Sequence, residues 1–351
     1  MKTAPAVFAV GDNYQILVPV SEPSLMWVQV GDRCFYDDAN GVLRSMTDVH
    51  RMTVPMALLN EAGAYTICER KIPERLPYCS KPKRTTKKTF PFYPVPEGSA
   101  RAYHIADAHN RVAEPIRAAK TYGDFDFLIF NGDMPNHSGD TENFLSVFEI
   151  ADALTGGTKP IVFTRGNHDL RGIYAEKYHE YAPNDNGNFY YTFRLGDIWG
   201  VVLDCGEDKN DNHVEYGHTI CCHDFRLRET EFLKGLHPDD PTIRRRLVIA
   251  HVPFTRADKK PFDIEQPLYR EWAEILKAQI RPDLMLCGHL HQIEIFPVGG
   301  KSDHLGQPCP VVIGAKPGDA YFAGAGILLG DNETVVTFTD SDGKILQSET
   351  L

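Results

Sequence analysis

The pattern of hydrophobic and polar positions differs between the N-terminal part of the chain and the part from residue 101 onward. Up to about residue 79, short runs rich in β-branched and aromatic residues, such as YQILVPV, SLMWVQV and GAYTICERK, are separated by Gly, Asn and Asp. This pattern is typical of strands joined by turns, and no helical period of useful length occurs before residue 110. We therefore expect a small all-β sandwich over residues 1–95, with a basic, proline-rich linker or edge strand at its end.

From residue 101, strands alternate with helices. FDFLIFNGD and KPIVFTRGN have the continuous apolar bodies of buried strands, and TENFLSVFEIADALT between them has the period of an amphipathic helix. Such alternation indicates a sheet with βαβ crossovers. The segment GNFYYTFRLGDIWGVVLDC has the pattern of a β-hairpin, and further strands and helices follow it. We expect a second sheet that packs against the first.

The charge balance and the cysteines narrow the class of partners. The chain has 48 acidic and 37 basic residues and a net charge of −11, which disfavours broad binding to nucleic-acid phosphates. The basic run from Lys81 to Lys88 is expected to be solvated. The chain has eight cysteines without a CxxC pair, which predicts reduced thiols. Its start makes a poor signal peptide and it has no long apolar span, so we expect a cytoplasmic protein without a membrane segment. The acidic net charge predicts no nucleic-acid partner.

Polar side chains that can bind metal ions follow five of the predicted strands. Because ligands of α/β sheets gather at the carboxyl ends of strands, we expect these side chains to lie together. Glycine immediately precedes three of the polar groups, at Gly132, Gly166 and Gly288, where it lets the backbone turn sharply and approach a ligand closely. The candidates are Asp107, His109, Asp133, Asn167, His251, His289 and His291, with His168 beside Asn167.

The types and the number of donors point to two ions. Carboxylate, imidazole and amide groups without thiolates suit borderline metals such as manganese, iron or zinc. So many donors would overfill one ion, whereas two ions about 3.5–4 Å apart share a bridging group. A central carboxylate is the natural bridge, and Asp133, which ends the most hydrophobic strand, is the candidate. We expect two divalent or trivalent metal ions as cofactors.

The series DxH, GD, GNHD, H and GHxH, in this order between residues 107 and 291, resembles the calcineurin-like metallophosphoesterase superfamily. The resemblance implies a catalytic domain over residues 96–351 with a four-layer α/β fold, in which two mixed sheets lie between helices. It also implies that one metal is held by Asp107, His109, Asp133 and His291. The other metal would be held by Asp133, Asn167, His251 and His289.

The N-terminal β-domain, of a fibronectin- or immunoglobulin-like kind, is similar to the layout of purple acid phosphatases. Those enzymes have a tyrosine ligand where this chain has Asn136, and they lack the histidine that this chain has as His109. We therefore expect no tyrosinate–iron ligation. Arg165, which precedes GNHD, resembles the phosphate-binding arginine of protein serine/threonine phosphatases, although those have an aspartate at the position of Asn136.

The resemblance implies a phosphoric ester hydrolase that acts on a small phosphorylated substrate. We predict that a hydroxide bridging the two metals attacks a phosphate monoester. The resemblance implies that His168 stabilises the transition state or protonates the leaving group. Asp169 either orients this imidazole or supports the loop, and Arg165 and Arg171 bind either phosphate or a loop carboxylate. Asp204 is interpreted as structural. Two alternatives stay open: a phosphodiesterase for cyclic nucleotides or other diesters with the same metal core, and a binding protein that has lost catalysis.

Overall fold

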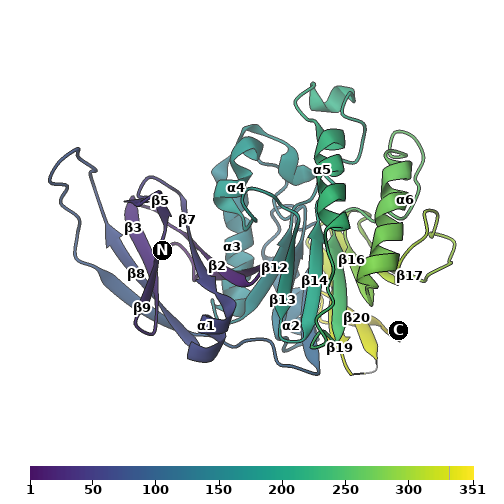
Figure 1. Ribbon diagram of the computed structural model, residues 1–351, viewed down its shortest axis with the longest axis horizontal. Coiled ribbons are helices and arrows are strands. Elements are labelled where there is room, and N and C mark those ends of the chain that lie inside the picture. The colour runs from purple at the N-terminus through teal and green to yellow at the C-terminus, as the bar shows by residue number, and fades with distance from the viewer. Residues whose placement is uncertain (332) are drawn as a thin grey trace.

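The structure is a computed structural model that describes residues 1–331 and 333–351, and most of its strands belong to one large mixed sheet (Figure 1). One half of this sheet is built on three parallel strands that are almost entirely buried: β10 (Ala100–Ile105), β11 (Phe127–Asn131) and β12 (Pro160–Thr164). Both faces of these strands are covered, which explains their continuous apolar sequences. Beyond β10 this half continues with the antiparallel strands β19 (Tyr321–Leu329), β20 (Thr334–Asp340) and β21 (Ile345–Thr350).

The other half of the sheet has a second set of parallel strands. These are β14 (Ile198–Leu203), β15 (Arg245–Ala250), β16 (Leu284–Cys287) and β18 (Val311–Gly318). Two antiparallel strands complete it, β13 (Tyr191–Leu195) beside β14 and β17 (Gln292–Phe296) beside β18. The end of β18 also pairs with β19, so that one strand connects the two halves.

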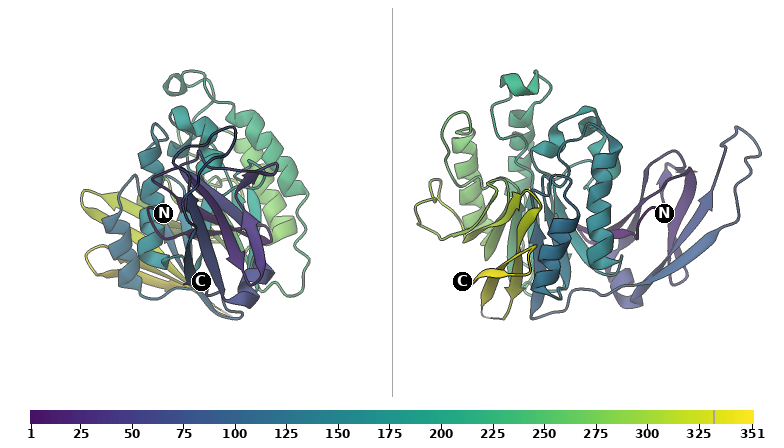
Figure 2. Two further views of the ribbon diagram at one scale, coloured as in Figure 1. Left: turned by 90° about the vertical axis from the view of Figure 1, so that its left-hand side faces the viewer. Right: turned by 180° about the vertical axis from the view of Figure 1, so that it is seen from behind.

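The two halves of the sheet face each other between two layers of helices (Figure 2). Alternate residues of β11 show the arrangement, because Phe127 and Ile129 enter the core shared with the second half, whereas Leu128 and Phe130 pack under helices. The helices of the first half are α2 (Ala113–Tyr122) and α3 (Thr141–Thr155). Those of the second half are α5 (Cys222–Lys234) and α6 (Gln266–Ile275). The predicted four-layer α/β fold is confirmed.

The N-terminal region, for which a small all-β sandwich is predicted, contains a separate, small antiparallel sheet. Its strands, in spatial order, are β4 (Arg33–Tyr36), β3 (Ser24–Val30), β8 (Ala64–Lys71) and β9 (Thr86–Pro91). The basic, proline-rich segment therefore includes an edge strand, β9. The β8–β9 hairpin projects from one end of the molecule (Figure 1). A short ribbon of β5 (Asp38–Ala39) and β6 (Val42–Leu43) and a helix that the pattern did not predict, α1 (Met56–Ala62), complete the region.

Three N-terminal strands belong to the large sheet instead. β1 (Ala6–Val10) lies parallel to β12, and β2 (Asn13–Pro19) and β7 (Val49–Pro55) follow it in antiparallel order. These strands thus extend the sheet that carries the predicted ligands. The division of the chain at residue 95 stays a prediction.

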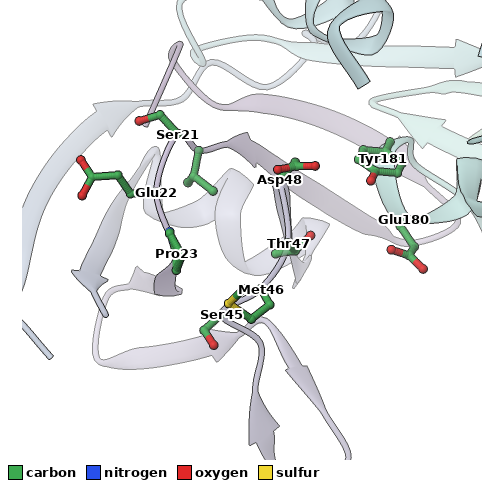
Figure 3. Close-up of a pocket in the computed structure, with 10 residues that line it drawn as sticks. Ser21, Glu22, Pro23, Ser45, Met46, Thr47, Asp48, Glu180 and Tyr181 are labelled. Atoms are coloured by element: carbon green, nitrogen blue, oxygen red, sulfur yellow. The ribbon is translucent and has the colours of Figure 1, made fainter. Parts of the chain in front are cut away.

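Short helical turns complete the fold, and the last of them directly continues helix α6. They are η1 (His168–Leu170), η2 (Ile173–Lys177), α4 (Tyr178–Tyr181), η3 (Val214–Tyr216) and η4 (Leu276–Ile280). A cavity of about 230 Å³ lies between the N-terminal strands and α4, with Glu22, Asp48 and Glu180 among its lining residues (Figure 3). Within the described part of the chain, no helix has the length and apolar character needed to cross a membrane.

Candidate metal centre

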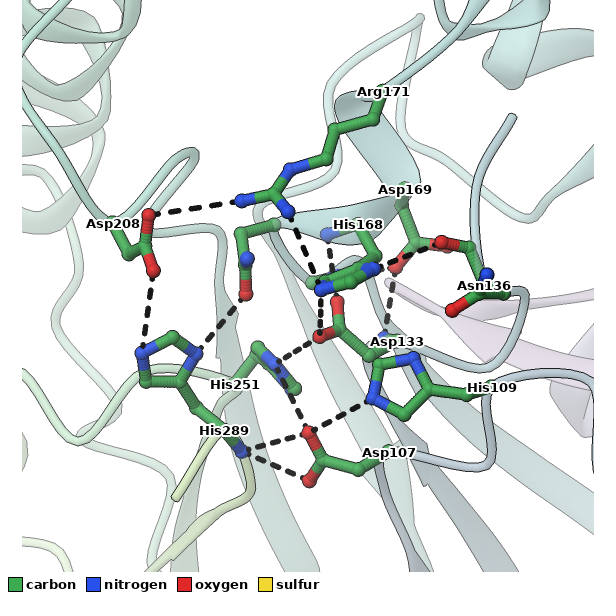
Figure 4. A network of polar contacts seen from close by, with 12 residues as sticks. Asp107, His109, Asp133, Asn136, His168, Asp169, Arg171, Asp208, His251 and His289 are labelled. Atoms are coloured by element: carbon green, nitrogen blue, oxygen red, sulfur yellow. Dashed lines mark hydrogen bonds and ion pairs between the residues drawn. The ribbon is translucent and has the colours of Figure 1, made fainter. Parts of the chain in front are cut away.

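The candidate ligands follow strands from both halves of the large sheet. Asp107, Asp133 and Asn167 come after β10, β11 and β12 of the first half. His251 and His289 come after β15 and β16 of the second half. Figure 4 shows the side chains of Asp107, Asp133, His251 and His289 pointing toward one another from the separate strands. The structure therefore brings the strand ends together as the sequence predicts.

The backbone at these strand ends turns through conformations that ordinary residues rarely adopt. The φ angles of Asp107, Asp133 and His289 are 52°, 51° and 67°, all in the left-handed region. A Cβ atom at Gly166 would overlap Oδ1 and the backbone nitrogen of Asp133. The absence of a side chain at Gly166 thus lets the loop after β12 approach the central carboxylate.

Asp107 lies at the centre of one group of donors. Its carboxylate accepts hydrogen bonds from the backbone N–H of His289 at 2.9 and 3.2 Å. Oδ1 lies 3.3 Å from Nε2 of His291 and 3.9 Å from Nε2 of His109. The two histidines are themselves 3.1 Å apart, Nε2 to Nε2. Asp107, His109 and His291 form a group whose ligand atoms are close enough to hold one cation.

Asp133 lies between this group and the side chains of the second half. Its Oδ1 accepts a hydrogen bond from the backbone N–H of His168 at 2.8 Å. Its Oδ2 lies 3.2 Å from Nε2 of His251, and the same Nε2 is 3.7 Å from Oδ1 of Asp107. Asp133 thus takes part in two further groups of potential ligands, one with Asp107 and His251 and one with His109 and His168. This central place is the one expected of a bridging carboxylate.

The remaining pair of predicted ligands lies on the other side of His251. Oδ1 of Asn167 is 3.1 Å from Nδ1 of His289. Nε2 of His289 points away from Asn167, to a distance of 3.8 Å from Oδ2 of Asp208. The direction of the imidazole leaves Nδ1 beside Asn167 and places Nε2 toward a carboxylate, an arrangement that often orients metal-binding histidines.

The orientation of His251 and the protonation state of His109 are compatible with metal binding. Nδ1 of His251 interacts with the carbonyl of Asn131 at 2.6 Å. Nε2 of the same ring is buried, faces both carboxylates and is not aligned for a hydrogen bond to any described residue. Burial lowers the pKa of His109 to about 4, so this imidazole is neutral at pH 7. The neutral imidazole of His109 beside carboxylates is a type of donor that divalent cations select.

The electrostatics of the centre favour positive charge. Burial alone would lower the pKa of His251, but Asp133 and Asp107 raise it to about 10. Burial likewise opposes ionisation of Asp133, yet the neighbouring His251 and His168 lower its pKa below the usual range. A hydrogen bond to Asp107 raises the pKa of His291. The two buried carboxylates therefore create a site that attracts cations.

His168 lies at the partly exposed edge of the centre. Its Nδ1 is 2.8 Å from the carbonyl oxygen of Asn136, to which it can donate a hydrogen bond. The other nitrogen, Nε2, is 3.9 Å from Oδ2 of Asp133 and 3.4 Å from Nη1 of Arg171. The side chain is 28% exposed. His168 can therefore present Nε2 to a substrate while its ring is held in place.

Asp169 is buried and points away from the imidazole of His168. Oδ2 accepts hydrogen bonds from the backbone N–H groups of Gly166 at 2.6 Å and Asp133 at 3.0 Å, and Oδ1 accepts one from the hydroxyl of Tyr178 at 2.5 Å. Burial and the charge of Asp133 raise the pKa of Asp169 to about 7, although these three donors favour the ionised form. The contacts favour support of the loop over orientation of the imidazole.

Arg165 also forms contacts of a structural kind. Its Nε and Nη2 both lie 2.7 Å from Oδ2 of Asp204. The guanidinium carbon is 4.6 Å from the ring centre of Phe189 and 5.7 Å from that of Phe225. These contacts favour the salt-bridge alternative for Arg165, and they agree with the structural interpretation of Asp204.

Sequence reasoning did not identify several residues that hold the centre. Asn131 donates from Nδ2 to the carbonyl of Leu286 at 2.9 Å, which links the two halves of the sheet, and its own carbonyl interacts with His251. Tyr178, which contacts Asp169, and Asp208, which lies beside His289, come from segments with no recognisable motif. Asn131 alone had a local signal, because it ends the apolar strand directly before the GD pair.

Comparisons with known proteins identify relatives of the chain. A family model described as calcineurin-like phosphoesterase matches residues 100–293. A purple acid phosphatase from yellow lupin (Lupinus luteus) seeds is 12% identical, with coverage of 100% of this chain and 74% of that one and a TM-score of 0.62. A dimetal phosphatase from Danio rerio is 12% identical, with coverage of 73% of this chain and 98% of that one and a TM-score of 0.49. No curated protein sequence matches the chain. The lupin structure supports the fold alone.

Proposed function

The chain belongs to the calcineurin-like phosphoesterase family of metal-dependent hydrolases, and from this premise we propose that it is a phosphatase that hydrolyses phosphate monoesters at a two-metal centre. The observation that carries the proposal is the convergence of five strand ends on the carboxylates of Asp107 and Asp133. His168 lies beside these groups and remains partly exposed. The presence of His168 beside a complete set of candidate ligands argues against a binding protein that has lost catalysis.

Two groups of side chains would hold the ions. The first comprises Asp107, His109, Asp133 and His291. The second comprises Asp133, Asn167, His251 and His289. When bound, the ions supply Lewis acidity, which neutralises charge on phosphate oxygens and lowers the pKa of water. Manganese, iron and zinc all suit these donors.

His168 is the residue that we propose to act on the leaving group. The carbonyl of Asn136 lies 2.8 Å from Nδ1, which fixes the ring and leaves Nε2 as the atom that can hold or release a proton. Proton donation to a leaving oxygen avoids formation of a free alkoxide. In this proposal the buried side chains bind the metal ions, and His168 supplies the proton donor at the partly exposed edge of the centre.

The proposal is tested by replacement of the bridging carboxylate. We expect Asp133→Asn to abolish both metal uptake and turnover, because one neutral amide cannot replace a carboxylate shared by two cations. The measurements are elemental analysis of the purified protein and hydrolysis of an aryl phosphate monoester. Asp239→Asn, which changes an exposed aspartate outside the centre, is the matched control. Full activity of Asp133→Asn would rule out the two-metal proposal.

A second measurement separates monoesters from diesters. The same aryl alcohol is supplied as a phosphate monoester and as the corresponding diester, and kcat/KM is compared for the metal-loaded protein. We expect faster hydrolysis of the monoester. Preference for the diester would support the phosphodiesterase alternative, and stable metal binding without hydrolysis of either would support the non-catalytic one.

A further inference from the structure

The space between the two halves of the sheet changes from apolar to polar directly before the metal centre. The apolar core that the halves share includes one residue from each of β10, β11 and β12: Ala102, Ile129 and Val162. Two residues further along the same strands, and therefore on the same face, the side chains are polar: His104, Asn131 and Thr164. All three are completely buried. We call these three residues the polar layer.

Asn131 connects the two halves through both its side chain and its backbone. Its Nδ2 donates to the carbonyl of Leu286 on β16 at 2.9 Å, and its own carbonyl lies 2.6 Å from Nδ1 of His251. Leu286 comes three residues before His289, so a displacement of β16 at this point would also move that imidazole. Asn131 is therefore in contact with the structure that places both histidines of the second group of ligands.

His104 determines the orientation of the Asn131 amide. The carbonyl of Leu286 can only accept, so the NH₂ group of Asn131 must face it. The other N–H of this group is available to Nε2 of His104, 2.8 Å away. Burial lowers the pKa of His104 to about 3, so the ring is neutral and Nε2 can accept this hydrogen bond. A Cβ atom at Gly314 would overlap Nδ1 of His104, which shows that the ring lies directly against β18 of the second half.

Thr164 makes a second connection between the halves. Its Oγ1 donates to the carbonyl of Leu203 at the end of β14 at 3.1 Å, closer than the carbonyl of Arg165 at 3.4 Å. Thr164 comes three residues before Asn167, another predicted ligand of the second group. Hydrogen bonds have defined lengths and directions, whereas apolar contacts are non-directional. The two connections therefore fix the separation of the halves next to the centre.

The two groups of predicted ligands depend differently on this separation. The first group takes three ligands from the first half and only His291 from the second half. The second group takes two from each half, Asp133 and Asn167 from the first and His251 and His289 from the second. A change in the separation would divide the second group into two pairs, whereas three ligands of the first group would stay together.

Resting on the proposed function, we propose that Asn131 and Thr164 are positioning residues for the second metal ion, with His104 holding the amide of Asn131. Neither residue is itself a ligand. Both set the separation of the halves, and the carbonyl of Asn131 also directs Nε2 of His251 toward the carboxylate of Asp133. Groups that orient metal ligands in this way commonly change metal affinity about 10- to 100-fold.

The polar layer is tested by metal binding rather than by turnover. Asn131→Leu removes the amide with little change in volume and should weaken binding of the second Mn²⁺ ion about 10- to 100-fold, with the first ion bound as in the unmodified protein. Ile129→Val, on the same face of β11, is the control for a core substitution and should bind both ions normally. The measurements are calorimetric titration with Mn²⁺ and electron paramagnetic resonance, which distinguishes a coupled pair of ions from a single ion.

Thr164 provides a second test that disturbs the core less. Thr164→Val removes the hydroxyl and should also weaken the second ion selectively, whereas Thr164→Ser keeps the hydroxyl and should recover most of the affinity. This pair also decides the case in which Asn131→Leu does not fold. Two ions bound with unmodified affinity in folded Thr164→Val, or equal weakening of both ions, would overturn the proposal.

These outcomes are distinct from failure of the proposed function. An unmodified protein that never binds two Mn²⁺ ions would reject the two-metal centre itself. An unmodified protein that binds two ions but hydrolyses no phosphate ester would reject the phosphatase proposal and leave the role of the polar layer intact.

Discussion

At the scale of single residues, the centre depends on ligands held at strained backbone angles. Asp107, Asp133 and His289 all have positive φ angles, a conformation that costs roughly 1–3 kcal/mol for residues with side chains. Hydrogen bonds from the backbone N–H groups of His289 and His168 to the two carboxylates offset this cost and aim their oxygens. Strain of this kind persists where the surrounding structure fixes each group, which agrees with a site built to bind ions.

His168→Ala should separate metal binding from catalysis. We expect metal content to stay unchanged, because the imidazole is not in either group proposed to hold an ion. We expect kcat for an aryl monoester to fall by about 10²–10⁴-fold, the usual contribution of a general acid. His237→Ala, at an exposed position, is the control. An unchanged rate would remove the role assigned to His168.

Gly166→Ala should damage the centre without changing any ligand. The added Cβ would overlap Oδ1 and the backbone nitrogen of Asp133, so the strand ends must move apart. We expect loss of bound metal and a decrease of about 1–3 kcal/mol in the free energy of unfolding, as for an overpacked core. The measurements are elemental analysis and urea denaturation. Gly235→Ala, at a helix end with a negative φ, is the control, and equal metal content in both variants would contradict the prediction.

At the scale of elements, the loop after β12 is held from several directions. Asp169 joins it to Asp133 after β11 and to Tyr178 on α4. Ser138 donates from its hydroxyl to the carbonyl of Asp169 and from its backbone N–H to the carbonyl of Arg171, both at 2.7 Å. The loop that carries His168 is therefore part of a rigid unit with its neighbours, although it contains little regular structure.

Tyr178→Phe should test whether Asp169 is structural. The variant leaves Oδ1 of a buried carboxyl without its donor, which costs about 1–3 kcal/mol of stability. We expect a lower melting temperature and nearly normal kcat in assays well below that temperature. Tyr174→Phe on the adjacent η2 turn is the matched control. A large loss of kcat with unchanged stability would favour a catalytic role for Asp169.

At the scale of the whole molecule, the N-terminal strands and the catalytic region share one structure. β1 pairs with β12, and Phe8 packs edge-on against Phe163 with ring centres 6.1 Å apart. Nε2 of Gln15 donates to the carbonyl of Asn184, and the hydroxyl of Tyr65 donates to the carbonyl of Gly157, both at 2.7 Å. The N-terminal partners in these contacts lie outside residues 100–293, the range of the family match, and β1 covers the edge of β12, the strand that leads to His168.

Removal of residues 1–95 should therefore disrupt the catalytic region. The truncated chain would expose the edge of β12, which invites aggregation. We expect little soluble protein, and loss of cooperative thermal unfolding in what is recovered. As a control, replacement of residues 73–85, the projecting end of the β8–β9 hairpin, by a short turn should leave turnover unchanged. A stable, active fragment of residues 96–351 would show that the boundary at residue 95 separates independent domains.

The sequence by itself determined the chemistry of the strand ends and the alternation of strands and helices. Both are local properties: a buried parallel strand is a run of apolar residues, and Asp133 or His289 directly follows such a run after a glycine. The tertiary structure decided which arginine faces His168, why Asp169 is buried, and where β1 lies. Those outcomes depend on Glu207, which accepts hydrogen bonds from Arg171, and on Asp204, Tyr178 and β12. These partners are distant along the chain, and contacts between distant segments leave no periodic pattern in a single sequence.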